Sequence, residues 1–203
     1  MKSQIFKKKL KKVDIIFIVC FLLSAISIPV ALFLKSSDLK GILFSTLLLT
    51  PLFGALWYLA YYDYKKMEVQ PTLSLALIIV LGIVNILAFF FWKDNEFGYN
   101  NLLGGITLGV IFQLIVLLTK ERGLGQGDVR IAIISGLLVG FDGLTPWLYI
   151  TIFSSLLYGI IIAIKRRKFR GLKIPFVPFM VFGVVILIIS HLHLTQIHCF
   201  AQI

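Results

Sequence analysis

The chain has 203 residues, of which 59% are hydrophobic and 14% are charged, with 20 Lys and Arg against 9 Asp and Glu. Soluble globular domains are closer to half apolar and about a quarter charged, so this composition argues against a water-soluble enzyme and for a membrane protein. In a soluble protein the basic excess would suggest nucleic acid. Here the basic residues form short tracts between apolar segments, so we expect membrane lipids as partners and no nucleic acid.

The chain begins with the basic stretch MKSQIFKKKLKKVD, which resembles the start of a signal peptide. The apolar run that follows is longer than the roughly 7–15 residues of a signal-peptide core. We therefore interpret it as a first membrane span that is not cleaved. The chain is expected to consist of a basic segment with a first transmembrane helix, residues 1–40, and a membrane domain, residues 41–203.

Apolar segments follow one another at residues 13–34, 41–62, 73–92, 102–119, 129–141, 146–164 and 174–194. Most approach the ~20 residues that a helix needs to cross ~30 Å of hydrocarbon. The fifth is short, so we expect it to begin below the membrane surface or to be sheltered by neighbouring helices. Because backbone groups in a bilayer must be hydrogen-bonded internally, the spans are expected to be helices. The predicted fold is all-α, a polytopic membrane protein with about seven transmembrane helices and no soluble domain.

The basic residues also predict the orientation in the membrane. If the N-terminus is cytoplasmic, the inner segments 1–12, 63–72, 120–130 and 165–173 hold 17 of the 20 Lys and Arg residues. The outer segments hold only Lys35, Lys40 and Lys93. Since cytoplasmic loops are enriched in Lys and Arg, we expect a multi-pass protein of the cytoplasmic (inner) membrane with its N-terminus inside and its C-terminus outside.

Two of the nine acids adjoin apolar segments directly. Asp63 follows the second segment in WYLAYYDYKK, and Asp128 precedes the fifth in GLGQGDVR. The predicted topology puts both on the cytoplasmic side. Ionisable residues at membrane depth are costly and are candidates for function, although each acid alone could equally be a helix-end charge. The other acids lie in or beside loops and are expected to be solvated: Asp14, Asp38, Glu68, Asp94, Glu96, Glu121 and Asp142.

As a pair, the two acids could perform acid–base chemistry. Two nearby carboxylates do not both ionise easily, so they share a proton. One can then activate water while the other donates to a scissile carbonyl. Gly125 and Gly127 tolerate positive φ and allow another backbone to approach, so an extended substrate could lie beside Asp128. Alternatively, with Gly123, these glycines only cap the preceding helix and turn the chain.

At these residues the chain resembles the GxGD-type intramembrane aspartyl proteases, in particular the membrane domain of the type IV prepilin peptidases. The resemblance rests on LAYYDYKK, on the Gly-rich stretch that leads into GQGDVRI, on KIPFVPFMVFG, and on the order of the helices from about residue 41 onward. Arg130 stands where that family usually has Lys, Val177 replaces a usual Gly, and the proline after the first acid comes one place late, at Pro71.

The resemblance implies an activity and a set of site residues. It implies that two aspartates activate water to cleave the short basic leader of prepilin-like proteins, after a glycine, at the cytoplasmic membrane face, without metal or cofactor. The catalytic residues implied are Asp63 and Asp128. The residues implied to bind substrate or shape the site are Gly125, Gly127, Arg130, Pro175 and Pro178. The sequence leaves open the oligomeric state and whether the substrate belongs to a pilus, a secretion system or a DNA-uptake fibre.

The cysteines bear on a second activity of that family. Many bacterial members carry two C-x-x-C pairs associated with methylation of the mature pilin. Here only Cys20 and Cys199 occur, and they match no such spacing. We therefore expect peptidase activity without methyltransferase activity of that type.

The paired acids are also compatible with other functions. The same acids could serve a small ion-coupled transporter, but we find no convincing inverted repeat or Pro/Gly-broken helix pair. A presenilin-like or signal-peptide-peptidase-like enzyme is a minor variant, because the Pro-Ala-Leu stretch of that group is missing. An assembly subunit without chemistry would leave the paired acids unexplained. The three histidines near the C-terminus, His191, His193 and His198, are expected to be solvated rather than to bind metal.

Overall fold

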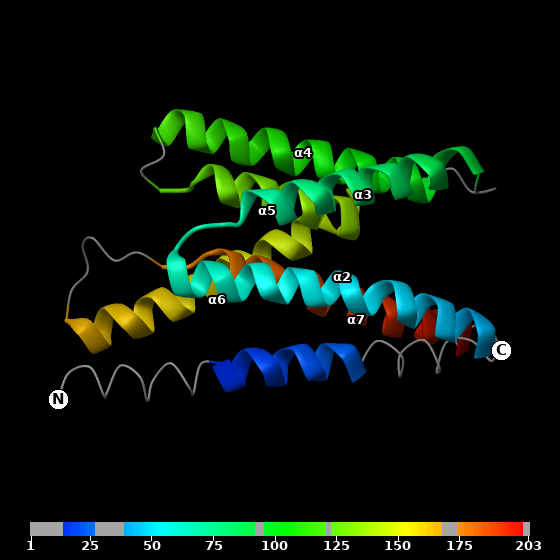
Figure 1. Ribbon diagram of the computed structural model, residues 1–203, viewed down its shortest axis with the longest axis horizontal. Helices are drawn as coiled ribbons and strands as arrows, with labels where there is room; N and C mark the ends of the chain where they lie inside the picture. The colour runs from blue at the N-terminus through cyan, green and yellow to red at the C-terminus, as the bar shows by residue number, and fades with distance from the viewer. Residues whose placement is uncertain (1–13, 27–38, 92–95, 121–122, 168–173, 201–203) are drawn as a thin grey trace. The chain divides into compact units, whose positions relative to one another are not determined.

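The computed structural model describes residues 14–26, 39–91, 96–120, 123–167 and 174–200. Within these ranges the chain is helical with short connections and has no strand, which confirms the all-α prediction (Figure 1). A first helix, Asp14–Ile26, precedes six labelled ones. These are α2 (Leu39–Lys66), α3 (Pro71–Phe91), α4 (Glu96–Thr119), α5 (Gln126–Val139), α6 (Leu144–Arg166) and α7 (Val177–Phe200).

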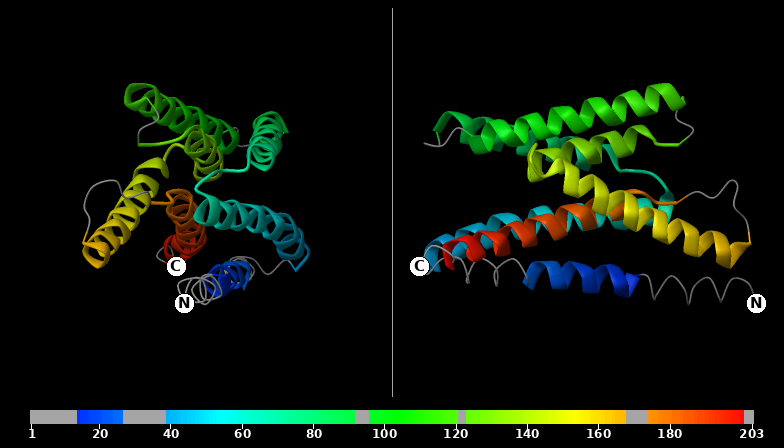
Figure 2. Two further views of the ribbon diagram at one scale, coloured as in Figure 1. Left: turned by 60° about the vertical axis from the view of Figure 1, so that its left-hand side comes forward. Right: turned by 180° about the vertical axis from the view of Figure 1, so that it is seen from behind.

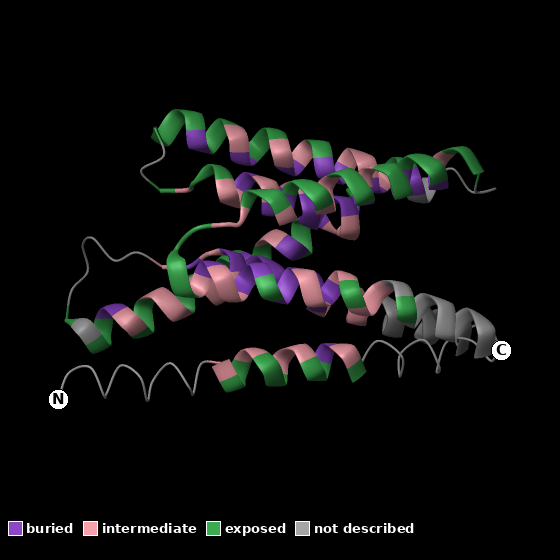
Figure 3. Cartoon of the chain, viewed as in Figure 1, coloured by how far each residue is buried: buried purple, intermediate pink, exposed green. Residues whose placement is uncertain are grey.

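Three stretches of the described chain are long and apolar enough to cross a membrane, namely Pro71–Phe91, Gly98–Thr119 and Leu144–Lys165. Their outward surfaces carry large apolar side chains, as expected where lipid replaces water. Phe91 and Leu118, for example, are 84% and 82% exposed. Figure 3 shows this exposed surface along α3 and α4. The chain is therefore a polytopic membrane protein, and the full count of seven spans stays a prediction.

The short α5 differs from these spans. Its 14 residues extend about 21 Å at 1.5 Å per residue, less than the ~30 Å of the hydrocarbon core. Half of its residues are buried, among them Val129, Ile131, Ile134 and Leu137. Of the two arrangements predicted for the short fifth segment, this burial supports shelter by neighbouring helices.

The chain forms two compact units, one of residues Met1–Tyr61 with Ile189–Ile203 and one of residues Tyr62–Ile188. In the first unit, two side-chain hydrogen bonds fasten the first helix to α2. Trp57 Nε1 donates to Ser24 Oγ over 3.1 Å, and Tyr61 Oη donates to Asp14 Oδ1 over 2.8 Å. The ring of Phe17 makes edge contacts with the rings of both Trp57 and Tyr61. The aromatic residues of α2 in this unit therefore hold a neighbouring helix.

In the second unit, glycines bring α4 and α5 into backbone contact. A Cβ atom on Gly136 would lie 2.3 Å from the carbonyl oxygen of Gly104, and one on Gly104 would lie 2.6 Å from that of Gly136. A Cβ on Gly105 would meet Leu137 at 2.7 Å. Small residues allow membrane helices to approach this closely. Figure 2 shows α4 and α5 side by side in both of its views.

Buried amides connect α3, α4 and α5 near the turn that follows α5. Asn85 Nδ2 donates to the carbonyl oxygens of Leu81, over 2.9 Å, and Leu137, over 3.3 Å. Asn101 Nδ2 donates to Asn85 Oδ1 over 2.9 Å. Both asparagines are buried, and water is absent from a bilayer core, so each amide depends on the others for its hydrogen bonds. This cluster helps to fix α3 and α4 against α5, the helix that carries Asp128.

We expect Asn85→Leu to lower the free energy of unfolding by about 1–3 kcal/mol, because it leaves Asn101 Nδ2 and the Leu137 carbonyl without their partner. Thermal unfolding of the purified protein in detergent measures the loss. Thr119→Val is a suitable control, since the exposed Thr119 hydroxyl bonds only to carbonyl oxygens of its own helix. Equal stability of Asn85→Leu and wild type would contradict a structural role for the cluster.

Candidate active site

Asp63 lies in the last turn of α2, immediately after the apolar segment and within the second unit. It is buried, with 7% of its surface exposed. Its Oδ2 accepts a hydrogen bond from the backbone N–H of Val177 over 3.3 Å. Val177 is the first residue of α7, and a helix N-terminus offers unpaired N–H groups and a positive dipole end. The start of α7 therefore stabilises a carboxylate at Asp63.

The prolines around Val177 explain why this N–H is available. Pro178 has no N–H, and the N–H groups of Phe179 and Met180 both donate to the carbonyl of Phe176. Of these first residues of α7, only Val177 donates to Asp63. Pro175 and Val177 are buried, which fixes this turn in place. The resemblance implied that Pro175 and Pro178 bind substrate or shape the site. The geometry supports the second role, because both prolines flank Val177 in the turn that holds Asp63.

Asp128 is the third residue of α5 and is half-buried. Its Oδ2 accepts a hydrogen bond from the N–H of Gly125 over 2.9 Å, and its own N–H donates to the Gly125 carbonyl over 3.0 Å. Asp128 therefore caps the start of its own helix. The Gly125–Asp128 turn holds the carboxylate at the end of α5, directly before the apolar part of that helix.

The backbone conformation of the glycines before Asp128 differs from the two roles that the sequence suggested for them. Among the described glycines only Gly140 has a positive φ, so neither Gly125 nor Gly127 uses the left-handed region. They do not end α4 either, because Lys120, with φ 50, is the left-handed residue at that helix end. The glycines instead lead into α5, with Gly125 in an extended conformation as its N-cap.

Gly127 and Gly125 differ in what surrounds them. A Cβ atom on Gly127 would lie 2.6 Å from Val69 Cγ2, so the space beside this glycine is filled by the chain itself. A Cβ on Gly125 would meet nothing closer than 4.0 Å, where Asp128 Oδ2 lies. Gly127 thus permits the link that follows Asp63 to contact the turn that carries Asp128, and open space remains beside Gly125.

The charge of Asp128 acts on Asp63. Burial and then the charge of Asp128 raise the pKa of Asp63 to about 6, against the opposing effect of the Val177 N–H. Burial also raises the pKa of Asp128, which the Gly125 N–H opposes. The two acids that the sequence paired are therefore close enough for the charge of one to act on the other, and their joint catalytic role stays a prediction. Within the described part of the chain, the second oxygen, Oδ1, of each carboxylate receives no hydrogen bond, which leaves it available for water or substrate.

Positive charge gathers at the end of the second unit that holds both acids. The Lys and Arg residues of this unit whose side chains are described belong to the C-terminal ends of α2, α4 and α6 and the N-terminal part of α5. These helix ends lie toward the left of Figure 1. The residues are Lys65, Lys66, Lys120, Arg130, Lys165 and Arg167. Arg130 is half-buried and forms no hydrogen bond or ion pair within the described residues. The charge distribution agrees with a cytoplasmic location of this end.

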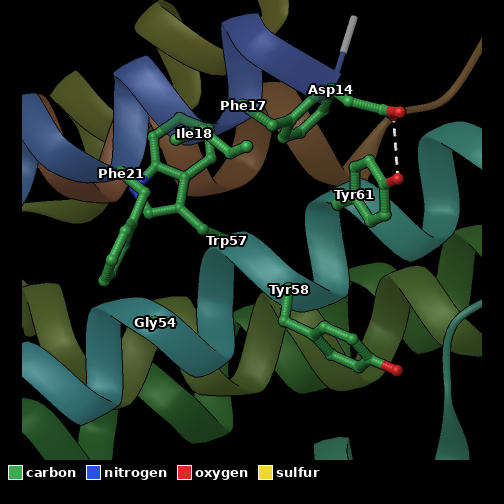
Figure 4. A pocket seen from close by; sticks show the side chains of 8 residues that line it. All are labelled: Asp14, Phe17, Ile18, Phe21, Gly54, Trp57, Tyr58 and Tyr61. Atoms are coloured by element: carbon green, nitrogen blue, oxygen red, sulfur yellow. Dashed lines mark hydrogen bonds between the residues drawn. The ribbon is translucent and has the colours of Figure 1, made fainter. Parts of the chain in front are cut away.

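Neither a metal site nor a second acid pair is found in the rest of the described chain. In the described ranges, no three His, Cys, Asp or Glu side chains form a group that could hold a metal ion. The side chains of His191, His193 and His198 lie outside the described residues. In the first unit, a cavity of about 340 Å³ opens between the first helix and α2 (Figure 4). It is lined mainly by aromatic and aliphatic side chains and contains a single acid, Asp14, so it offers no acid pair.

Sequence reasoning gave no site role to three residues: Val177, which bonds Asp63, Val69, which contacts Gly127, and Gln70, which follows Val69. The role of Val177 is that of a backbone N–H, which carries no residue-type signal. The proline that follows it, typical of the first turn of a helix, could have indicated a free donor there. Val69 and Gln70 belong to the short link after Asp63, whose path only the fold reveals.

Comparison with known proteins adds one finding. The model of the type IV leader peptidase family matches residues 50–164, a range that includes Asp63, Asp128 and the glycines before it. No curated protein and no solved structure matches the chain.

Proposed function

Because the chain belongs to the type IV leader peptidase family, we propose that it is an aspartic endopeptidase that removes the short basic leader of prepilin-like proteins. The observation that carries the proposal is the electrostatic interaction between Asp63 and Asp128. Each of these acids is held through one oxygen by a backbone N–H. An acid pair in which one carboxyl keeps a proton and the other is ionised is the arrangement with which aspartic proteases hydrolyse peptide bonds.

In the proposed mechanism, Asp63 holds the shared proton because its pKa is raised to about 6 by burial and by the charge of Asp128. Ionised Asp128 takes a proton from water as the water oxygen attacks the scissile carbonyl carbon, and Asp63 gives its proton to the carbonyl oxygen. When the C–N bond breaks, the proton on Asp128 passes to the leaving amine. The hydroxyl proton of the tetrahedral intermediate returns to Asp63, which restores the starting state.

The proposed location follows from the charge distribution. The acids lie at the end of the second unit where its described Lys and Arg side chains gather, and positive-inside topology makes this the cytoplasmic face. We infer a protein of the cytoplasmic membrane with its N-terminus inside and its C-terminus outside. A substrate would reach the site from the cytoplasm while its apolar helix stays in the bilayer.

The direct test uses the full chain in detergent micelles and a synthetic peptide. The peptide has a short Lys-rich leader that ends in glycine, followed by about 20 apolar residues, enough to form a membrane-spanning helix. Mass spectrometry should show a single cut after the glycine. Addition of a methyl donor should not add the mass of a methyl group to the new N-terminus. An intact peptide, or cleavage within the apolar helix, would overturn the proposal.

The cleavage rate should depend on pH in a defined direction. The active state has Asp63 protonated and Asp128 ionised. As pH rises through about 6, Asp63 loses its proton, so kcat/KM should fall. At lower pH Asp128 also becomes protonated and the base is lost, so kcat/KM should fall on that side too. A rate measured across this range in one detergent tests the prediction. A rate that continues to rise through neutral pH would contradict it.

A further inference from the structure

The cavity of the first unit lies between two matching stripes of side chains, one on the first helix and one on α2 (Figure 4). The first helix contributes four residues from Asp14 to Phe21, and α2 contributes four from Gly54 to Tyr61. Each set follows the i, i+3, i+4, i+7 spacing of a single helix face. The volume of about 340 Å³ falls within the roughly 300–1,000 Å³ of small-molecule sites. The cavity is therefore large enough to hold part of a ligand.

The two ends of the cavity differ chemically. At one end, the half-buried Asp14 accepts a hydrogen bond through Oδ1 from Tyr61 Oη over 2.8 Å. At the other end, a Cβ atom on Gly54 would lie 3.5 Å from the ring of Phe21. Asp14 and Phe21 are two turns apart on their helix, a distance of about 10 Å. One end is thus acidic and the other is apolar.

The acidic end lies at the cytoplasmic surface of the membrane in the proposed topology. Asp14 begins the first helix directly after the basic N-terminal stretch, and Tyr61 lies near the cytoplasmic end of α2. Trp57 and both tyrosines of the cavity are residue types that membrane interfaces favour. Ile18 and Tyr58, which line the cavity, are 57% and 48% exposed. The cavity therefore opens to its surroundings at the depth of the lipid headgroups.

We propose that this cavity binds a phospholipid whose headgroup carries a primary ammonium group, as phosphatidylethanolamine does. A carboxylate has about four lone-pair positions, so Asp14 can accept ammonium N–H donors in addition to the Tyr61 hydroxyl. Aromatic rings attract the same cation, and the rings of Phe17, Trp57 and Tyr61 contact one another at this end. The beginning of an acyl chain extends toward the apolar end.

A lysine of the substrate leader is the alternative source of an ammonium group, and two observations favour the lipid. Residues two apart on an α-helix are separated by about 200°, so Tyr61 and Asp63 project from nearly opposite faces of α2. A peptide held at Asp14 would therefore contact a face of α2 that does not carry Asp63. A lysine stem also has only about four methylene carbons, too few to fill a cavity whose apolar end is about 10 Å away.

The test measures lipid binding to the full chain in detergent by native mass spectrometry. Phosphatidylethanolamine is compared with phosphatidylglycerol of the same acyl chains. Phosphatidylglycerol is the stringent competitor, because it is anionic and the basic stretch before Asp14 attracts it by charge alone. Wild type should bind one phosphatidylethanolamine about three- to tenfold more tightly, the effect of one partly exposed, charge-assisted hydrogen bond.

Two variants separate the ends of the cavity. Asp14→Asn removes the charge but keeps an oxygen for the Tyr61 hydroxyl, so it should abolish the preference by weakening phosphatidylethanolamine alone. Gly54→Leu fills the apolar end, so it should weaken both lipids equally, and its unfolding temperature reports whether the fold survives. Glu68→Gln is the matched control for charge, because Glu68 is an exposed acid that does not line the cavity. Its preference should equal that of wild type.

Equal affinities of wild type for the two lipids would overturn the proposal, and so would an unchanged preference in Asp14→Asn. The Lys-leader peptide, added in excess, should leave phosphatidylethanolamine bound. Displacement of the lipid by the peptide would instead identify the cavity as a peptide site, and the lipid proposal would be wrong. Asp63→Asn should bind the lipid as wild type does, so the result is independent of the proposed peptidase activity.

Discussion

Replacing either Asp63 or Asp128 with Asn is expected to reduce leader cleavage by about 10²- to 10⁴-fold, the usual contribution of a positioned general acid or base. Asn has the shape of Asp and keeps a side-chain oxygen that can accept the N–H of Val177 or Gly125. It cannot exchange a proton. The fold should therefore survive while the chemistry is lost, as measured by single-turnover cleavage of the Lys-leader peptide.

Glu68→Gln provides the control for this result. Glu68 lies in the same link as Gln70, five residues after Asp63, and is exposed. Its replacement removes a negative charge near the site without changing either proposed catalytic group, so cleavage should stay within about twofold of wild type, as for most exposed substitutions. Normal cleavage by either Asp variant would contradict the two-acid mechanism. An equal loss in Glu68→Gln would show that net charge rather than the pair determines the rate.

The second large effect concerns the contact between α4 and α5. Gly136→Val is expected to prevent stable folding, because even its Cβ would lie 2.3 Å from the carbonyl oxygen of Gly104, a backbone atom that cannot rotate away. Overpacking typically costs ~1–3 kcal/mol and more where backbones must separate, against a total stability of ~5–15 kcal/mol. The measurement is the yield of monodisperse protein extracted from membranes, together with its unfolding temperature.

Gly82→Ala tests whether replacing any helical glycine of this unit destabilises the protein. Gly82 lies in the middle of α3, and a Cβ there would have no neighbour within 4 Å. Because Ala has a higher helix propensity than Gly, this change should be neutral or stabilising by up to ~1 kcal/mol. If Gly136→Val were extracted and unfolded like Gly82→Ala, the close approach of α4 and α5 would not be needed for stability.

Much of the fold could be predicted from the sequence because apolar length reports directly on membrane helices. All seven apolar segments contain a described helix. The boundaries were less accurate. Helix α4 begins at Glu96, several residues before the apolar segment at 102, because Asn101 is buried and hydrogen-bonded to Asn85. A polar residue inside a helix end is predictable only if its partner on another helix is known.

The residues of the candidate site could likewise be predicted only in part. Asp63 and Asp128 could be paired from sequence, because both stand at helix ends on one predicted side of the membrane. Gly127 was interpreted as room for a substrate, whereas the structure places Val69 there. The sequence shows that a glycine has no side chain but not which atoms use the space. Val177 was missed because a free backbone donor is a property of the folded chain.

The hydrogen bond between Val177 and Asp63 has a consequence for biosynthesis. It joins residues 114 positions apart, and the ribosome makes Asp63 long before Val177. While α3 to α6 are being inserted, the Asp63 carboxylate has no partner from α7. It acquires one only when translation has passed the start of that helix. Partly synthesised chains therefore contain both acids but lack the backbone N–H that holds Asp63, and the proposed activity should begin only after the last helix has entered the membrane.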